Sequence, residues 1–142
     1  MTRSLLILLA LFSLTLQSCV FRPAIDEQGN ITVRTANKLM RSHGARQFKK
    51  MKRDKAISSD PRFTEPVARV AERLKQVITL PHAEWDFVVF EDLSPNAFAL
   101  PGGKVGVNTG LFQIIGDDKQ ADAILAAILG HEISHTTAAH AQ

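Results

Sequence analysis

The sequence has few of the residues on which several protein classes depend. It contains one cysteine among 142 residues, which excludes a scaffold held together by disulfides. It has no tyrosine, one tryptophan and eight phenylalanines, so it lacks the interleaved aromatic side chains on which nucleic-acid-binding proteins stack bases, and we expect no nucleic-acid partner. A hydrophobic content of 45% and a net charge of only +3 exclude a disordered chain. The length suits a single packed domain.

The chain also lacks an apolar run long enough to span a membrane. Residues 5–16 are mostly apolar, but such a run is shorter than the roughly 20 residues of a spanning helix and has the length of a signal-peptide core. It ends in Leu-Gln-Ser-Cys, which resembles a bacterial lipobox. We therefore expect residues 1–18 to be a lipoprotein signal peptide and Cys19 to be a lipidated N-terminus; the alternative is a plain secretory signal. Because Val20 and not Asp follows, we expect an anchor on the periplasmic face of the outer membrane.

A basic segment follows the expected anchor. Residues 31–55 contain nine Lys or Arg and one acid, Asp54. This segment could lie on an anionic lipid surface, where each cation contributes about 1 kcal/mol. It could also be a solvated helix face, which is the common reason for a charge run. Residues 20–33 are predicted to be a tether and turn, and residues 19–57 together a lipidated tether with this basic segment.

Hydrophobic periodicity predicts an α+β arrangement in the rest of the chain. Apolar residues at helical spacing predict a helix from Asp60-Pro61 to about residue 80. The β-branched and aromatic residues 85–90 predict a strand, and residues 96–100 and 104–108 predict two extended pieces around a tight glycine turn. A final helix is expected to begin at Asp117-Asp118, and its apolar faces predict a central position in the fold.

The final helix carries His131-Glu132-Ile133-Ser134-His135. Residues four apart differ by about 40° around a helix, so His131 and His135 project from one face and can reach a single zinc ion. Glu132 lies about 100° from His131, which places its carboxylate beside the metal rather than on it. There it can take a proton from zinc-bound water and deliver it to the leaving amine. The pattern predicts zinc-dependent peptide hydrolysis with Glu132 as the base.

The surrounding residues resemble the membrane-associated zinc metallopeptidase family that includes the HtpX heat-shock protease and the CaaX prenyl protease. The resemblance is greatest to its bacterial periplasmic lipoprotein branch and the related mitochondrial inner-membrane protease. It rests on residues 96–105, 108–112 and 129–135 and on His140. It implies a zincin-like, mainly helical α+β fold whose small sheet has an edge strand along the substrate cleft. The residues that it places at the cleft are Asn96, Ala97, Phe98, Ala99, Leu100, Gly102 and Gly103.

The third zinc ligand is missing from this pattern. A catalytic zinc takes three protein ligands and water, and the resemblance implies a Glu on a later helix as the third. His140 lies nine positions from His131 and therefore about 180° around a continuous helix. Glu91 and Asp92 are available carboxylates, but nothing in the sequence selects one. We expect the third ligand downstream of Gln142, with residues 58–142 forming the N-terminal part of the peptidase domain.

Two hypotheses follow. The first is a zinc metalloendopeptidase of the bacterial cell envelope that acts on misfolded or misassembled proteins and reaches the membrane through Cys19. The second is a truncated, non-catalytic lipoprotein remnant that keeps the edge strand as a peptide-binding surface.

Overall fold

The computed structural model describes residues 24–25, 31–32, 36–116 and 120–137, and the chain divides into two units at residue 32. In the first unit, strand β1 (Ala24–Ile25) pairs antiparallel with β2 (Ile31–Thr32). These four residues lie within residues 20–33, for which the sequence predicts a tether and turn, and each extended pair satisfies backbone groups of the other. Cys19 and the signal segment lie outside the described residues.

The second unit is an α+β structure with a three-stranded mixed sheet. The prediction of an α+β fold is confirmed, and each predicted strand is present within one residue of its expected bounds. In chain order the described elements are α1 (Lys38–Asp54), α2 (Pro61–Val77), β3 (Asp86–Phe90), β4 (Ala97–Leu100), β5 (Lys104–Asn108), a single 3-10 turn η1 (Thr109–Leu111), α3 (Phe112–Ile115) and α4 (Ala121–Thr137).

Side-chain caps set where the first two helices begin. Asn37 Oδ1 accepts a hydrogen bond from the Met40 N–H at 2.9 Å, and Asp60 Oδ1 accepts one from the Arg62 N–H at 2.9 Å. Pro61 occupies the first turn of α2, where its missing N–H costs nothing. These caps satisfy donors that a helix start leaves unpaired. The predicted helix beginning at Asp60-Pro61 is confirmed.

The sheet has the strand order β3-β5-β4, with β3 and β5 parallel and β4 and β5 antiparallel. The turn from β4 into β5 passes through Gly102 and Gly103, which have φ angles of 93° and 81°. Residues other than glycine rarely adopt positive φ angles, because their Cβ atom clashes with the backbone. The two glycines therefore allow the tight turn that the sequence predicts.

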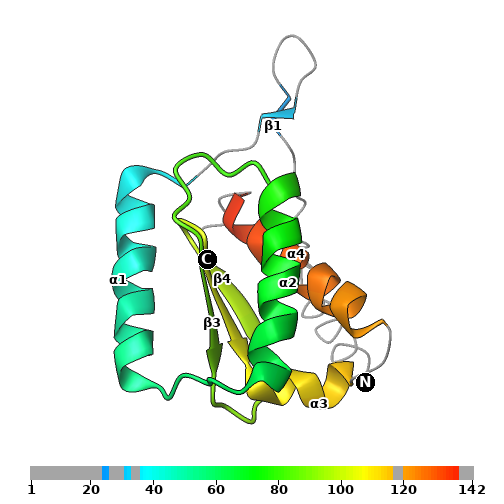
Figure 1. Cartoon of the computed structure of the whole chain (residues 1–142). Helices are drawn as coiled ribbons and strands as arrows, with labels where there is room; N and C mark the ends of the chain where they lie inside the picture. The colour runs from blue at the N-terminus through cyan, green and yellow to red at the C-terminus, as the bar shows by residue number, and fades with distance from the viewer. Residues whose placement is uncertain (1–23, 26–30, 33–35, 117–119, 138–142) are drawn as a thin grey trace, which may run out of the picture. The chain divides into compact units, whose positions relative to one another are not determined.

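Helices cover both faces of the sheet (Figure 1). On the α1 face, Phe48 packs edge-on against Phe90 and Phe98, with ring centroids 6.1 Å and 6.4 Å apart. Phe98 lies over the central strand at Gly106, where an added Cβ would be 2.2 Å from the ring. The residues that α2 and α4 bury on the other face include Val70, Leu74, Val89, Val105, Val107, Leu125, Leu129 and Ile133.

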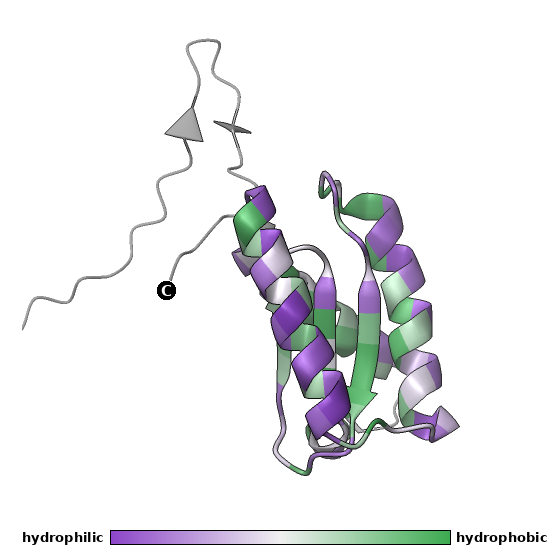
Figure 2. Cartoon of the chain, turned by 90° about the vertical axis from the view of Figure 1, so that its left-hand side faces the viewer, coloured by the Kyte–Doolittle hydropathy of each residue, from purple (hydrophilic) through white to green (hydrophobic). Residues whose placement is uncertain are grey.

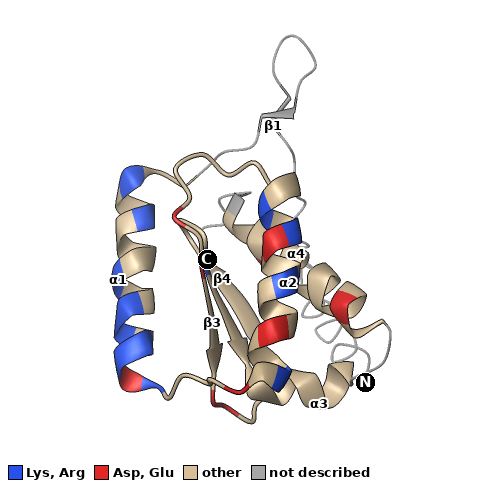
Figure 3. Cartoon of the chain, in the orientation of Figure 1, with Lys and Arg blue, Asp and Glu red and all other residues tan. Residues whose placement is uncertain are grey.

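Helix α1 exposes charge on its outer side. Figure 2 looks onto this side, which is largely hydrophilic, with hydrophobic strand residues behind it. Figure 3 shows Lys and Arg along most of the helix. Its buried residues are Gly44 and Phe48, and Lys52 pairs with Asp86 of β3 at 2.6 Å. The outer side of α1 is therefore a charged face open to solvent, as one of the two interpretations of the basic segment expects. The inner side of α1 packs on the sheet.

The two edges of the sheet differ. Residues 56–58 run along the outer edge of β3, where the Ser58 N–H donates to Val89 O and the Glu91 N–H donates to Ala56 O, both at 2.9 Å. In the described part of the chain β4 pairs with β5 alone. The free edge of the sheet is therefore β4.

Helix α4 is buried along one stripe only. Leu125, Leu129 and Ile133, each four residues apart, are at most 1% exposed, whereas Ile124 is 39% exposed. The sequence predicts a central position for this helix. That prediction holds for the stripe of Leu125, Leu129 and Ile133, and does not hold for the side that carries Ile124. None of the described helices is long and apolar enough to cross a membrane.

Candidate metal centre and substrate edge

The two predicted zinc ligands lie one turn apart near the end of α4. The Nε2 atoms of His131 and His135 are 3.0 Å apart, and the rings are nearly perpendicular. Both side chains are exposed and Glu132 is half-buried. The imidazoles therefore converge through the same ring nitrogen on a point that solvent can reach.

This geometry fits zinc. Two imidazole nitrogens at about 2.0–2.1 Å from one zinc and at a tetrahedral angle stand about 3.3 Å apart. The observed 3.0 Å separation needs an adjustment of a few tenths of an ångström, which a small rotation of either ring provides. A neutral imidazole is also a common ligand of this metal.

The described residues supply two ligands and no third. Among them, no group of three or more His, Cys, Asp or Glu side chains is placed to hold a metal ion. Asp92, one of the carboxylates considered from the sequence, instead accepts hydrogen bonds from Ser94 and, at 3.0 Å, from Lys55 Nζ. The hydrogen bonds from Ser94, followed by the one from Lys55, lower the pKa of Asp92 to about 2. His140 lies outside the described residues.

The start of α4 is tied to α2 by a salt bridge that the sequence does not predict. Arg69 Nε and Nη2 donate to the two carboxylate oxygens of Asp122 at 3.1 Å and 3.0 Å. This bond holds the pKa of Asp122 below its usual value and raises the pKa of Arg69. Asp122 lies in the first turn of α4, so the pair sets where the helix begins relative to α2. The sequence hints at this salt bridge only through Asp122, an acidic residue in the first turn of the helix.

The predicted cleft residues form the free edge of the sheet and the turn beyond it. Strand β4 packs against α4, which carries the two histidines. These residues differ in exposure: Asn96 is exposed, Phe98, Ala99 and Leu100 are half-buried, and Ala97, Gly102 and Gly103 are buried. Their role in substrate binding stays a prediction.

Comparison with known proteins identifies the family. The model of peptidase family M48 matches residues 61–142, more than half of the chain. The chain belongs to peptidase family M48. A mitochondrial metalloendopeptidase OMA1 from Schizosaccharomyces pombe is 39% identical over 88 residues, covering 61% of this chain and 25% of that protein. A Vibrio cholerae protein named as a beta-barrel assembly-enhancing protease is 28% identical over 98 residues, covering 69% of this chain and 19% of that protein.

A third relative, the OMA1 metalloendopeptidase of Danio rerio, is 36% identical over 81 residues, covering 55% of this chain and 16% of that protein. The chain therefore spans a quarter or less of the length of these relatives. Membership of family M48 implies zinc and confirms, at the level of the family, the prediction of a metalloendopeptidase.

Proposed function

We propose that this chain is the part of a zinc-dependent metalloendopeptidase that carries its HExxH helix and its substrate-pairing strand. The observation that supports this most is the convergence of His131 Nε2 and His135 Nε2 to 3.0 Å on the exposed side of a helix whose other side is packed in the core. A packed helix holds its side chains within the small tolerance that a metal site needs.

His131 and His135 would hold the ion, with the third protein ligand supplied from beyond Gln142. A bound zinc supplies Lewis acidity toward the scissile carbonyl and toward water. Glu132 accepts the proton of the attacking water and returns it to the leaving amine. Its half-buried position, about 100° around the helix from His131, keeps the carboxylate beside the ligand pair.

The substrate would lie in extended form along β4. The outer edge of β3 is already used by residues 56–58, whereas β4 has a partner on one side only in the described structure. An extended peptide can add to such an edge through backbone hydrogen bonds, which accept many sequences. This sequence tolerance suits a peptidase that removes misfolded or misassembled proteins.

We also propose that the protein is held at the bacterial cell envelope through lipidated Cys19, on the periplasmic face of the outer membrane. The proposal rests on the short apolar run and the Leu-Gln-Ser-Cys sequence that ends it. Labelling of cells with a fatty-acid analogue should mark the wild-type protein and leave Cys19→Ser unmarked. Equal labelling of both proteins would refute the anchor.

The catalytic assignment is tested in the protein that includes this chain and the downstream ligand. Glu132→Gln should lose casein hydrolysis and keep one zinc, because the amide cannot accept a proton and both imidazoles remain. His131→Ala should lose zinc and hydrolysis together. Appreciable turnover by Glu132→Gln would contradict its role as base, and absence of zinc and hydrolysis in the wild type would favour the non-catalytic remnant.

A further inference from the structure

The outer side of α1 carries a row of exposed and largely cationic side chains. Residues at alternating intervals of four and three positions lie on one side of a helix, and several exposed residues of α1 follow this spacing. We call them the outer stripe: Leu39, His43, Arg46, Lys50 and Arg53. Phe48, nine positions from Leu39, lies about 180° around the helix and is buried against the sheet. The outer stripe therefore faces directly away from the sheet.

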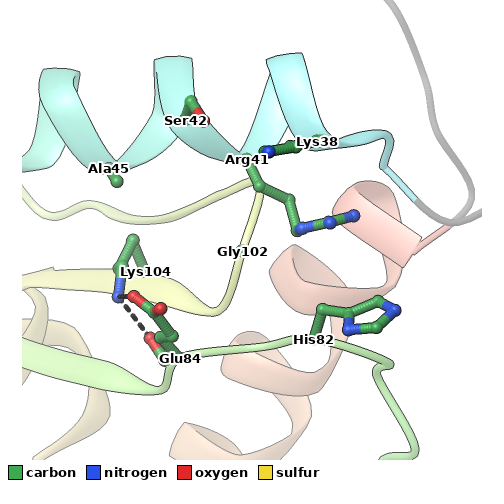
Figure 4. A pocket seen from close by; sticks show the side chains of 8 residues that line it. All are labelled: Lys38, Arg41, Ser42, Ala45, His82, Glu84, Gly102 and Lys104. Carbon is green, nitrogen blue, oxygen red and sulfur yellow. Dashed lines mark hydrogen bonds and ion pairs between the residues drawn. The ribbon is translucent and has the colours of Figure 1, made fainter.

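Two other cations of α1 turn inward and are already engaged. Arg41 donates to the carbonyl of Ala36 at 2.5 Å (Figure 4). Lys52 forms a salt bridge with Asp86 of β3 at 2.6 Å. Neither cation is available to a partner that approaches the outer side of the helix.

The outward cations are poorly balanced by negative charge. Among the residues that the structure describes, no carboxylate forms a salt bridge with Arg46, Lys50 or their neighbour Lys49. Arg53 pairs with Asp54, which is the acidic residue at the end of α1. Figure 3 shows Lys and Arg along the helix and acidic colour only at that end. The outer side therefore presents positive charge that a negatively charged surface could neutralise.

The shape and composition of the outer stripe favour a planar partner with an apolar layer. From Leu39 to Arg53 the stripe runs straight for about 21 Å, because a helix rises about 1.5 Å per residue. Leu39 is 73% exposed and stands in the same row as the cations. An anionic bilayer offers phosphate groups to the cations and hydrocarbon just below them to an apolar side chain. A nucleic acid or another soluble polyanion offers no such layer.

We propose that the outer stripe of α1 docks on the anionic headgroups of a lipid bilayer. Eighteen residues separate Cys19 from Lys38, and an extended chain of this length reaches about 65 Å at most. Lipid attached at Cys19 would therefore keep α1 close to the bilayer surface. The inference rests on the proposed function in this respect, because the proposed anchor supplies the membrane on which α1 docks.

Docking in this way would orient the metal centre. Helix α1 covers one face of the sheet, and α2 and α4 cover the other (Figure 1). A bilayer against α1 therefore leaves His131 and His135 of α4 on the side of the sheet that faces away from the membrane. Protein substrates in the surrounding solution could then reach the site without passing the lipid.

Vesicle sedimentation tests the docking surface in the full chain. Binding would be compared between vesicles of phosphatidylglycerol with phosphatidylcholine and vesicles of phosphatidylcholine alone. One Lys or Arg at an anionic surface changes affinity about fivefold, so the combined variant Arg46→Gln, Lys49→Gln and Lys50→Gln should lose about a hundredfold of the preference for anionic vesicles. The preference of the wild type should also shrink as salt is added.

A matched variant separates the outer stripe from net charge. Arg62→Gln, Arg73→Gln and Lys75→Gln together remove the same charge from α2 and should keep the preference. Both variants retain residues 1–37, so any contribution of the N-terminal segment is common to them. Circular dichroism would confirm folding. If a combined variant unfolds, Arg46→Gln alone should still lose about fivefold, and Arg46→Lys should restore the binding.

A fluorescent label tests the orientation. In a Cys19→Ser background the chain has no other cysteine, so His43→Cys on α1 or Gln76→Cys on α2 gives a single thiol for an environment-sensitive dye. On anionic vesicles the emission should move to shorter wavelength for the dye on α1 and stay unchanged for the dye on α2. A shift at both positions, or at neither, would contradict docking through α1.

Heparin, a soluble polyanion, tests the competing partner. Leu39→Gln keeps the charge of the outer stripe and should weaken binding to anionic vesicles while leaving any binding to heparin unchanged. Equal affinity of the wild type for heparin and for anionic vesicles, with Leu39→Gln affecting neither, would assign the outer stripe to soluble polyanions and overturn the proposal.

Two further results would overturn docking: equal binding of the wild type to both kinds of vesicle, or equal losses in the α1 and α2 variants. Failure here is distinct from failure of the proposed function, because the vesicle comparison requires neither lipidation nor zinc. A chain that docks through α1 and is not lipidated at Cys19 refutes the anchor alone. A lipidated peptidase without a preference for anionic vesicles refutes the docking surface alone.

Discussion

Two glycines in helices should respond in opposite ways to the same substitution. Gly44 of α1 and Gly130 of α4 each gain about 1 kcal/mol of helix propensity when replaced by alanine. At Gly130 the added Cβ has 4.0 Å to its nearest neighbour, Leu74 Cδ2, which is ordinary contact. At Gly44 it would lie 2.5 Å from the carbonyl oxygen of Pro101 and 3.2 Å from its nitrogen. These atoms are backbone, so they cannot move aside by rotating a side chain.

The magnitudes follow from these distances. Gly130→Ala should stabilise the fold by about 1 kcal/mol, which raises the melting temperature by about 4 °C in a domain of this size. Gly44→Ala must separate α1 from the turn, and overpacking of this kind costs about 1–3 kcal/mol. After the propensity gain, we expect a net loss of about 1 kcal/mol and a melting temperature lowered by about 4 °C.

Thermal unfolding followed by circular dichroism measures both variants against the wild type. The reasoning would be refuted if Gly44→Ala raised the melting temperature as much as Gly130→Ala, because α1 would then not approach the turn as closely as the structure shows. A double variant should give the sum of the two shifts, since the sites share no neighbour.

Three further predictions test the packing and electrostatics around α4 and β3. Leu129→Ala removes a fully buried side chain from the core and should destabilise the fold by about 3 kcal/mol in denaturant unfolding. Arg69→Ala should change global stability by less than about 1 kcal/mol because the pair is partly exposed, while hydrogen exchange at the start of α4 around Asp122 becomes faster. The pKa of Asp92 is about 2 in the fold and 3.8 ordinarily, so its contribution is present above pH 3.8 and is lost as the pH falls toward 2. Acid unfolding of Asp92→Asn should therefore depend less on pH within that window, and an unchanged acid limb would contradict the role of this carboxylate.

Local chemistry made much of the fold predictable. The Asp60-Pro61 start of α2 is a cap followed by a residue with a preset φ, and both signals act within a few positions along the chain. The glycine turn between β4 and β5 is likewise a local requirement for positive φ. The HExxH spacing predicted the converging histidines because helix geometry alone determines which face a residue occupies.

Features that depend on distant partners were not predictable. The parallel pairing of β3 with β5 places β4 at the free edge, and this order depends on packing among segments separated by tens of residues. Phe48 lies within a run of basic residues, so the pattern of charge conceals the apolar contact that fixes α1 on the sheet. A polar pocket between α1 and the segments before β3 and β5 is lined by both Arg41 and Lys104, which have no periodic relation in the sequence (Figure 4).

X-ray absorption at the zinc edge tests the central claim most directly, namely that α4 carries two of the metal ligands, His131 and His135. In the protein that contains this chain and the proposed third ligand, the spectrum should show two imidazole nitrogens at about 2.0–2.1 Å. His131→Ala should remove one of them and weaken zinc binding, and Arg46→Gln should leave the spectrum unchanged. A wild-type spectrum without imidazole scattering, or one that His131→Ala and His135→Ala both leave unaltered, would contradict the assignment.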